Sequence, residues 1–237
     1  MRIKCYSGLT LNEAELHARL PGAELAAPIA RGELLRDIRK QCNVVLIVDG
    51  KFHHSMSVSP SDILDALRAG IRVYGSSSMG ALRACELESY GMIGHGKVFE
   101  LVKSHRAFED DFLGQVFAPD NPTGAHLAFI DVYFNCETLH RKGEMSTEAF
   151  RTVTRLYAGL HYSERTPAAL LRLCRSAFKG DERLLALVER ATRKMGSQKK
   201  RDAHGLLGLV KRELASIERL NRRVTRSLAP HARARRL

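Results

Sequence analysis

The pattern of apolar and polar positions divides the chain into a first part with short strand-like runs and a second part with longer helical periods. In the first part, runs at 3–6, 44–48 and 71–74 have the length of strands, and segments with helical spacing separate them. The middle run, "VVLIV", is apolar at every position, which is typical of a parallel strand buried on both faces. This alternation predicts an α/β fold, with a parallel sheet and helices on both of its faces.

Local signals place several helix starts in this first part. The sequence "TLNE" (10–13) resembles a capping box, and a second helix is expected from about Gly32. Farther along, Ser59 can cap a helix, Pro60 suits its first turn, and Asp62 lies near its positive end. Each of these helices is followed by a strand, as the predicted crossovers require.

After about residue 120, helical spacing dominates. Residues 124–142 have the length of a helix, and shorter helices follow. The last helix carries an apolar stripe at three- and four-residue spacing, formed by Leu206, Leu207, Val210, Leu214, Ile217, Leu220, Val224 and Leu228. We therefore expect an α/β core domain over 1–120 that carries the functional site, and an α-helical C-terminal region over 121–237.

Composition narrows the class of protein. An apolar content of 44% can build a core, and no apolar run is long enough to cross a bilayer. The first residues do not resemble a signal peptide, and the five cysteines form no Cys-x-x-Cys pair and no zinc-like cluster with histidine. No Walker A or G-x-G-x-x-G sequence is present. We expect a cytoplasmic protein that has free thiols, contacts no membrane, and needs no metal or cofactor of its own.

The net charge of +12 is concentrated at one end of the chain. From Arg193 to Leu237 there are fourteen Lys or Arg and three Asp or Glu. Such a block suits an acidic partner surface, and it also suits a solvated helix face. No aromatic residues interleave with these charges, which disfavours single-stranded nucleic acid. We expect the basic helix to dock on a protein partner.

Two loops are candidates for a site, because ligands of α/β sheets bind beyond the carboxyl ends of the strands. The loop at 49–54 ("DGKFHH") follows the buried strand, and the loop at 75–80 ("GSSSMG") follows the next one. Parallel strands end at the same edge of the sheet, so the two loops are expected to share one pocket. Glycines in the second loop would let a ligand approach the backbone, and the helix that follows would favour an anion.

The serines allow two interpretations. Ser76-Ser77-Ser78-Met79-Gly80 resembles in part a nucleophile elbow, with Ser78 at the nucleophile position. Alternatively, Ser77 or Ser78 merely caps the helix. A nucleophile needs a base, for which His53 or His54 is the candidate, with Asp49 to orient it. Both histidines are equally compatible with an exposed loop.

Two charged features extend the candidate site. Arg83 lies one turn into the helix and could reach a bound carboxylate, or it could pair with Glu86 on the same helix face. The acidic run Glu109, Asp110 and Asp111 could supply a base or bind a basic partner, and it could also be a solvated loop.

Together these stretches resemble the TfuA-like family. The resemblance is carried by "ARGELL" (30–35), "DGKFHH" (49–54), "SPSDILDAL" (59–67), "VYGSSSMGALRACELESYGMIGHGKVFE" (73–100) and "EDD" (109–111). Two C-terminal segments, "YSERT" (162–166) and "QKKRDA" (198–203), resemble the family more weakly. The serine run followed by "GMIGHG" is the most specific part.

This resemblance implies a role beside YcaO-type ATP-dependent enzymes in peptide backbone thioamidation during the biosynthesis of modified peptides. The TfuA-like partner would recruit a small ubiquitin-like sulfur carrier of the ThiS kind and hydrolyse its C-terminal thiocarboxylate to supply sulfide. A precursor peptide is a further candidate partner. The alternative is a non-catalytic binding module that supports the YcaO enzyme allosterically.

The implied chemistry is acyl transfer through an oxyanion, which assigns roles to the candidate residues. Ser78 would attack or hold a water, and Asp49, His53 or one of the acidic residues at 109–111 would act as base. Substrate and oxyanion binding would fall to the residues around them, which are Ser76, Ser77, Gly80, Arg83, Glu109, Asp110 and Asp111.

Overall fold

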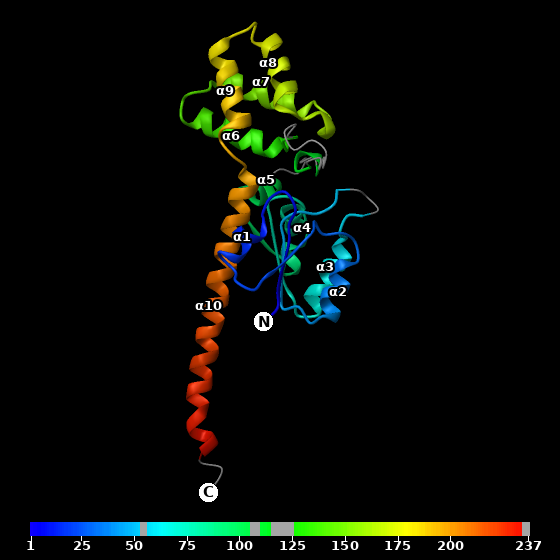
Figure 1. The fold of residues 1–237 in the computed structure, drawn as a ribbon, viewed down its shortest axis with the longest axis vertical. Helices are drawn as coiled ribbons and strands as arrows, with labels where there is room; N and C mark the ends of the chain where they lie inside the picture. Colours follow the sequence, from blue (N-terminus) through cyan, green and yellow to red (C-terminus); the bar gives the residue numbers. More distant parts are fainter. Residues whose placement is uncertain (53–55, 105–109, 115–125, 234–237) are drawn as a thin grey trace.

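The computed structural model describes residues 1–52, 56–104, 110–114 and 126–233, with residues 221–233 described by their backbone alone. An α/β lobe contains the sheet, and a helical lobe sits at one end of a long C-terminal helix (Figure 1). That helix runs along the α/β lobe and extends far beyond it (Figure 1). Among the described helices, none has the length and hydropathy that a bilayer span requires.

The sheet has five strands, all parallel, in the order β2-β1-β3-β4-β5. The strands are β1 (Ile3–Tyr6), β2 (Glu24–Ala26), β3 (Val44–Ile47), β4 (Arg72–Ser76) and β5 (Ile93–His95). The predicted parallel sheet is confirmed, and the fully apolar run is its central strand, buried at each position. The sequence pattern did not predict β2 and β5, which have three residues each.

Helices cover both faces of the sheet, as predicted. One face packs on α2 (Glu33–Arg39), α3 (Pro60–Arg68) and α4 (Met79–Leu87), and α5 (Lys97–Ser104) joins this layer beside β5. The other face packs on α1 (Glu13–His17) and on the first half of α10 (Gln198–Arg233). Alternate β3 residues point to opposite layers, Val45 to the first and Leu46 to the second.

The long C-terminal helix is therefore a component of the α/β lobe. Its residues Leu206, Leu207 and Val210 are fully buried in the same cluster as Leu46 and Tyr74 of the sheet. The division expected at residue 120 stays a prediction, but the chain returns to the sheet after the helical lobe. This return brings residues near 199 to the carboxyl edge of the strands.

The helical lobe has its own apolar cluster. It consists of α6 (Phe129–Arg141), α7 (Thr147–Ala158), α8 (Pro167–Ala177) and α9 (Glu182–Arg193). Asp131 of α6 links this lobe to α10, because its Oδ1 accepts hydrogen bonds from the Lys199 N–H and the Ser197 hydroxyl, both at 3.0 Å. These bonds satisfy donors at the start of α10.

Helix capping agrees with the sequence at one predicted start and differs at another. Ser59 and Asp62 form the expected capping box around Pro60. At the first helix, however, the capping box is formed by Asn12 and Glu15, because Thr10 lies outside the helix. The predicted box at 10–13 was wrong by two residues.

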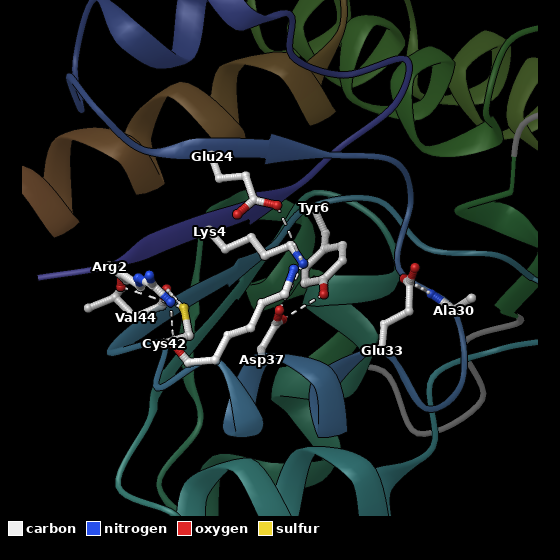
Figure 2. A network of polar contacts seen from close by, with 10 residues as sticks. Arg2, Lys4, Tyr6, Glu24, Ala30, Glu33, Asp37, Cys42 and Val44 are labelled. Carbon is white, nitrogen blue, oxygen red and sulfur yellow. Dashed lines mark hydrogen bonds and ion pairs between the residues drawn. The ribbon is translucent and has the colours of Figure 1, made fainter.

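A charged cluster beside α2 pairs a lysine with two carboxylates of the fold (Figure 2). Asp37, which is 1% exposed, accepts hydrogen bonds from Lys4 Nζ at 2.8 Å and from the Tyr6 hydroxyl at 2.6 Å. Glu24 adds a second carboxylate 3.7 Å from Lys4. Burial and the hydrogen bond to Asp37 raise the pKa of Tyr6. We call these four residues the Lys4 cluster.

Candidate functional site at the carboxyl edge of the sheet

A cavity of about 710 Å³ opens at the carboxyl edge of the sheet. The chain runs from β1 to β2 on one side and returns to β3 on the other side of β1. Such a reversal of strand order separates the two loops that follow. The crevice between these loops is the usual ligand position in an open α/β sheet. Both predicted loops contribute to the cavity, through Asp49 and Ser78, which confirms that they share one pocket.

The cavity has a polar floor and an apolar mouth. Its floor contains Asp49, Ser78 and Lys199, all less than a tenth exposed. Its mouth includes three of the large apolar side chains that are exposed on the described surface, namely Leu9 (50%), Phe52 (39%) and Met56 (44%). An exposed apolar rim around a buried polar floor is typical of a site that receives part of another molecule.

Asp49 holds the loop that follows β1. Its Oδ2 accepts hydrogen bonds from the Ser7 hydroxyl and from the N–H groups of Gly8 and Thr10, at 2.9–3.1 Å. Its Oδ1 accepts a hydrogen bond from the Thr10 hydroxyl at 2.8 Å. These four donors engage both oxygens of the carboxylate. The arrangement favours a positioning role for Asp49, because a base needs a free lone pair toward the reacting group.

The serine run forms a strained turn between β4 and α4. Ser77 has a positive φ of 70°, and the Ser78 N–H donates to the Ser76 carbonyl at 2.8 Å. A bond between residues two apart around a positive φ describes a γ-turn of the rare kind, which costs free energy in a residue other than glycine. The predicted strand-turn-helix elbow is present, but the residue with the strained backbone is Ser77, one position before Ser78.

The three hydroxyls have different surroundings. Ser77 Oγ donates to the Lys199 carbonyl at 2.7 Å and is fully buried beneath α10. Ser76 is equally buried and lies next to it. Ser78 is the serine of the run that lines the cavity, and its Oγ donates to the Leu113 carbonyl at 3.3 Å.

Ser78 occupies the N-cap position of α4, but its hydroxyl does not cap the helix. The capping interpretation therefore does not explain this serine. The residue instead lines the cavity, and its hydroxyl donates to the Leu113 carbonyl.

Packing explains the two glycines of the run. A Cβ on Gly80 would lie 1.7 Å from the Ile47 carbonyl oxygen, and a Cβ on Gly75 would lie 2.1 Å from the Gly80 oxygen. Both glycines thus allow α4 to start directly against β3 and β4. They fix the height of Ser78 above the sheet.

Arg83 takes the second of its two predicted roles. Its Nη1 binds both oxygens of Glu86, and its Nε donates to the Val58 carbonyl at 2.9 Å. Arg83 is not one of the described residues that line the cavity. The guanidinium instead fastens the segment before α3 to α4.

The acidic run is only partly described. His53, His54 and Glu109 lie outside the described residues. Asp110 is exposed, at the start of the short 3₁₀ helix Asp110–Phe112.

Asp111 is engaged with Arg165, whose Nη2 lies 3.0 Å from its Oδ2 and whose Nη1 donates to its carbonyl at 2.8 Å. Arg165 is 1% exposed. This contact holds the segment that presents the Leu113 carbonyl to Ser78.

Residues 49–166 match the family model described as "TfuA-like protein". The chain belongs to the TfuA-like family. A comparison with curated proteins gives no match. The matched part of this TfuA-like protein contains Asp49, the serine run and Arg165, whereas Lys199 lies beyond it.

Lys199 lines the cavity and Arg165 holds the neighbouring Asp111, and the sequence pattern did not predict either contact. Lys199 is 4% exposed, and its Nζ donates to the Leu113 carbonyl at 3.3 Å, the same oxygen that Ser78 contacts. Both residues fall in the two weaker family segments, "YSERT" and "QKKRDA". Those family segments are the signal that could have identified the two residues. Local patterns could not, because more than a hundred residues of chain separate Lys199 from Ser78.

The cysteine thiols of this TfuA-like protein are buried or half-buried. Four of the five thiols are buried, and Cys85 is half-buried. Burial raises the pKa of all five, to about 12 for Cys5, Cys85 and Cys136 and to about 11 for Cys174. Since the thiolate is the reactive form, these thiols are poorly reactive near neutral pH.

Proposed function

We propose that this TfuA-like protein recruits a ThiS-like sulfur carrier and hydrolyses its C-terminal thiocarboxylate, supplying sulfide to a YcaO-type enzyme that forms a peptide thioamide. The reaction converts a thiocarboxylate and water into a carboxylate and hydrogen sulfide. ATP chemistry would belong to the YcaO enzyme. The observation that carries the proposal is the strained turn that presents Ser78 to a cavity at the carboxyl edge of the sheet.

In this proposal Ser78 acts on the thiocarboxylate carbon, either by direct attack or by holding the attacking water. The N–H groups of Ala81 and Leu82 donate to the Ser78 carbonyl. The N–H groups before them are the first of α4, and such groups are free to stabilise an oxyanion. Asp49 supports the reaction by keeping the β1–α1 loop closed over the floor. Backbone strain beside Ser78 agrees with this role, because strained residues concentrate at active sites.

The thiols support hydrolysis rather than transfer through the protein. A persulfide relay needs an accessible thiolate, and the raised pKa values of the described cysteines oppose it. Direct release of sulfide into the cavity needs no cysteine. A neighbouring YcaO enzyme would then use the sulfide where it is released.

The test uses the purified protein without any YcaO enzyme. A thiocarboxylated ThiS-like carrier is added, sulfide is measured over time, and mass spectrometry follows conversion of the carrier to its carboxylate form. Release above the spontaneous rate, with matching conversion of the carrier, is the expected result. A carrier that binds and stays thiocarboxylated, while YcaO activity still rises, would instead favour the non-catalytic binding module.

A further inference from the structure

A second cavity, of about 560 Å³, lies in the helical lobe. It is formed by α6, the start of α8, the end of α9 and the turn that leads to α10. None of its described lining residues also lines the cavity at the carboxyl edge of the sheet. Five apolar residues contribute to its wall, namely Leu127, Val132, Pro167, Ala168 and Ala191. An apolar wall with a few polar groups, in a cavity of this volume, is typical of a ligand site.

Asp131 is the carboxylate of this cavity, and one of its oxygens is free. Its Oδ1 accepts the hydrogen bonds from Ser197 and Lys199 at the start of α10. Its Oδ2 accepts none from the described residues, and no cation among them forms an ion pair with Asp131. The residue is 7% exposed, and a carboxylate that is buried to this degree normally pairs with a positive charge. The oxygen left for a ligand in the cavity is therefore Oδ2.

The charges around the cavity favour a cationic ligand. The last carbonyls of α9, which ends at Arg193, favour a positive charge, whereas the start of α8 favours a negative one. These two helix ends offset each other. The Arg193 side chain is half exposed, and its Nε lies 3.9 Å from Glu189 Oε1. The carboxylate of Asp131 thus decides the sign of the charge that the cavity prefers.

The free oxygen also limits the kind of cation. A guanidinium binds best to both oxygens of a carboxylate, and Oδ1 of Asp131 is already engaged. A metal ion needs several ligands, and the described residues contain no cluster of three or more His, Cys, Asp or Glu that suits one. An ammonium group binds a single oxygen as a compact charge, and an aliphatic stem behind it packs on apolar surface.

We propose that the cavity of the helical lobe binds a primary ammonium group carried on an aliphatic chain, with Asp131 Oδ2 as its acceptor. The aliphatic chain lies along the apolar wall. Lysine side chains of polypeptides and free alkyl amines both carry such a group. The proposal goes beyond the proposed function, because it concerns a different cavity and does not depend on sulfide release.

The test uses the full-length protein and two probes of equal length. n-Pentylamine carries the ammonium, and n-pentanol is its neutral counterpart. Each probe is titrated into the protein while NMR follows the backbone amide shifts. We expect the amine to bind at least about tenfold more tightly than the alcohol, the scale of one charge-assisted hydrogen bond. The shift changes should centre on Thr166, Thr192 and Gly196, which line the cavity.

Asp131→Asn is the decisive variant. Its amide oxygen still accepts the hydrogen bonds from the start of α10, so the fold is kept while the negative charge is removed. The preference for the amine disappears in this variant. Glu144→Gln is the matched control, because it neutralises another carboxylate of the helical lobe, one that pairs with Arg190 and does not line the cavity. This variant keeps the preference.

Two peptides identify the source of the ammonium group. A pentapeptide with a central lysine is compared with the same peptide that carries norleucine instead. If the lysine peptide is preferred as strongly as the amine is, the ammonium site stands and its ligand is a polypeptide. If the amine binds and the lysine peptide does not, the site stands and its ligand is a free alkyl amine.

Three results would overturn the proposal. The first is equal binding of amine and alcohol by the wild type. The second is the absence of shift changes at the cavity with millimolar amine. The third is an unchanged preference in Asp131→Asn, which would show that Asp131 serves the start of α10 alone.

Discussion

Lys4 is partly buried and Lys199 is buried, and the charge around the two lysines differs. Lys4 contacts Asp37 at 2.8 Å and Glu24 at 3.7 Å, so its ammonium is paired with carboxylates of the fold (Figure 2). Lys199 contacts the Leu113 carbonyl at the cavity floor. The first arrangement is complete without a ligand. In the second, the ammonium has a neutral acceptor, and none of the described carboxylates pairs with it.

The largest expected loss of stability follows substitution of Lys4, the lysine that is paired with carboxylates. Lys4→Met leaves Asp37 buried without its cation, and breaking a buried pair in this way costs about 3 kcal/mol of the free energy of unfolding. Urea denaturation of the purified variant measures it. Sulfide release by the folded fraction should be unchanged. If the Lys4→Met protein is as stable as the wild type, the pairing of Lys4 with Asp37 does not stabilise the fold. The contrast drawn between the two lysines would then fail.

Asp49 provides an intermediate case, because it lies at the cavity but is satisfied by four donors. Asp49→Ala leaves those donors unpaired, and we expect a loss of about 2 kcal/mol in the free energy of unfolding. Asp49→Asn keeps an oxygen for the donors and is the matched control, with less than half that loss. If both variants keep full stability and lose sulfide release, Asp49 is a catalytic residue rather than a positioning one.

The exposed basic end of α10 should show the smallest effect on stability. The far half of this helix extends beyond the α/β lobe (Figure 1), and the last buried side chain among its described residues is Leu214. Deleting 229–237 should change the free energy of unfolding by less than about 0.5 kcal/mol. Association with an acidic partner such as the YcaO enzyme should weaken, most clearly at low salt.

The readout for this deletion is affinity at two salt concentrations. Loss of partner binding that is independent of salt would contradict an electrostatic role. Nanomolar binding of the intact protein to random oligonucleotides at physiological salt would indicate a nucleic-acid site instead.

The sequence predicted much of the sheet because its central strands carry strong local patterns. The apolar run at 44–48 and the turn signals around 59–62 were sufficient for β3 and the start of α3. The three-residue strands β2 and β5 lack such a pattern. For example, β5 is Ile-Gly-His and joins the sheet by pairing with β4. Their place in the sheet is decided by tertiary contacts.

The site was predictable to the extent that its residues follow strands. Asp49 and Ser78 were placed together because parallel strands end at one edge of a sheet. No local pattern indicates that Asp49 binds the β1–α1 loop or that α10 returns to the sheet and delivers Lys199. For Arg83 the pairing with Glu86 is confirmed, whereas its contacts with Val58 and Ser57 could not be predicted because those residues are distant in sequence.

The central claim is that Ser78 acts on a thiocarboxylate in this cavity, and the rate of sulfide release by Ser78→Ala tests it most directly. We predict a rate at least about a hundredfold below the wild type, the scale for losing a positioned nucleophile or oxyanion donor. Stability should fall by only about 1 kcal/mol, since one hydrogen bond to Leu113 is lost. Ser77→Gly, which keeps the positive φ and changes a hydroxyl covered by α10, should release sulfide within a few-fold of the wild type. A Ser78→Ala protein that releases sulfide at the wild-type rate would contradict this claim.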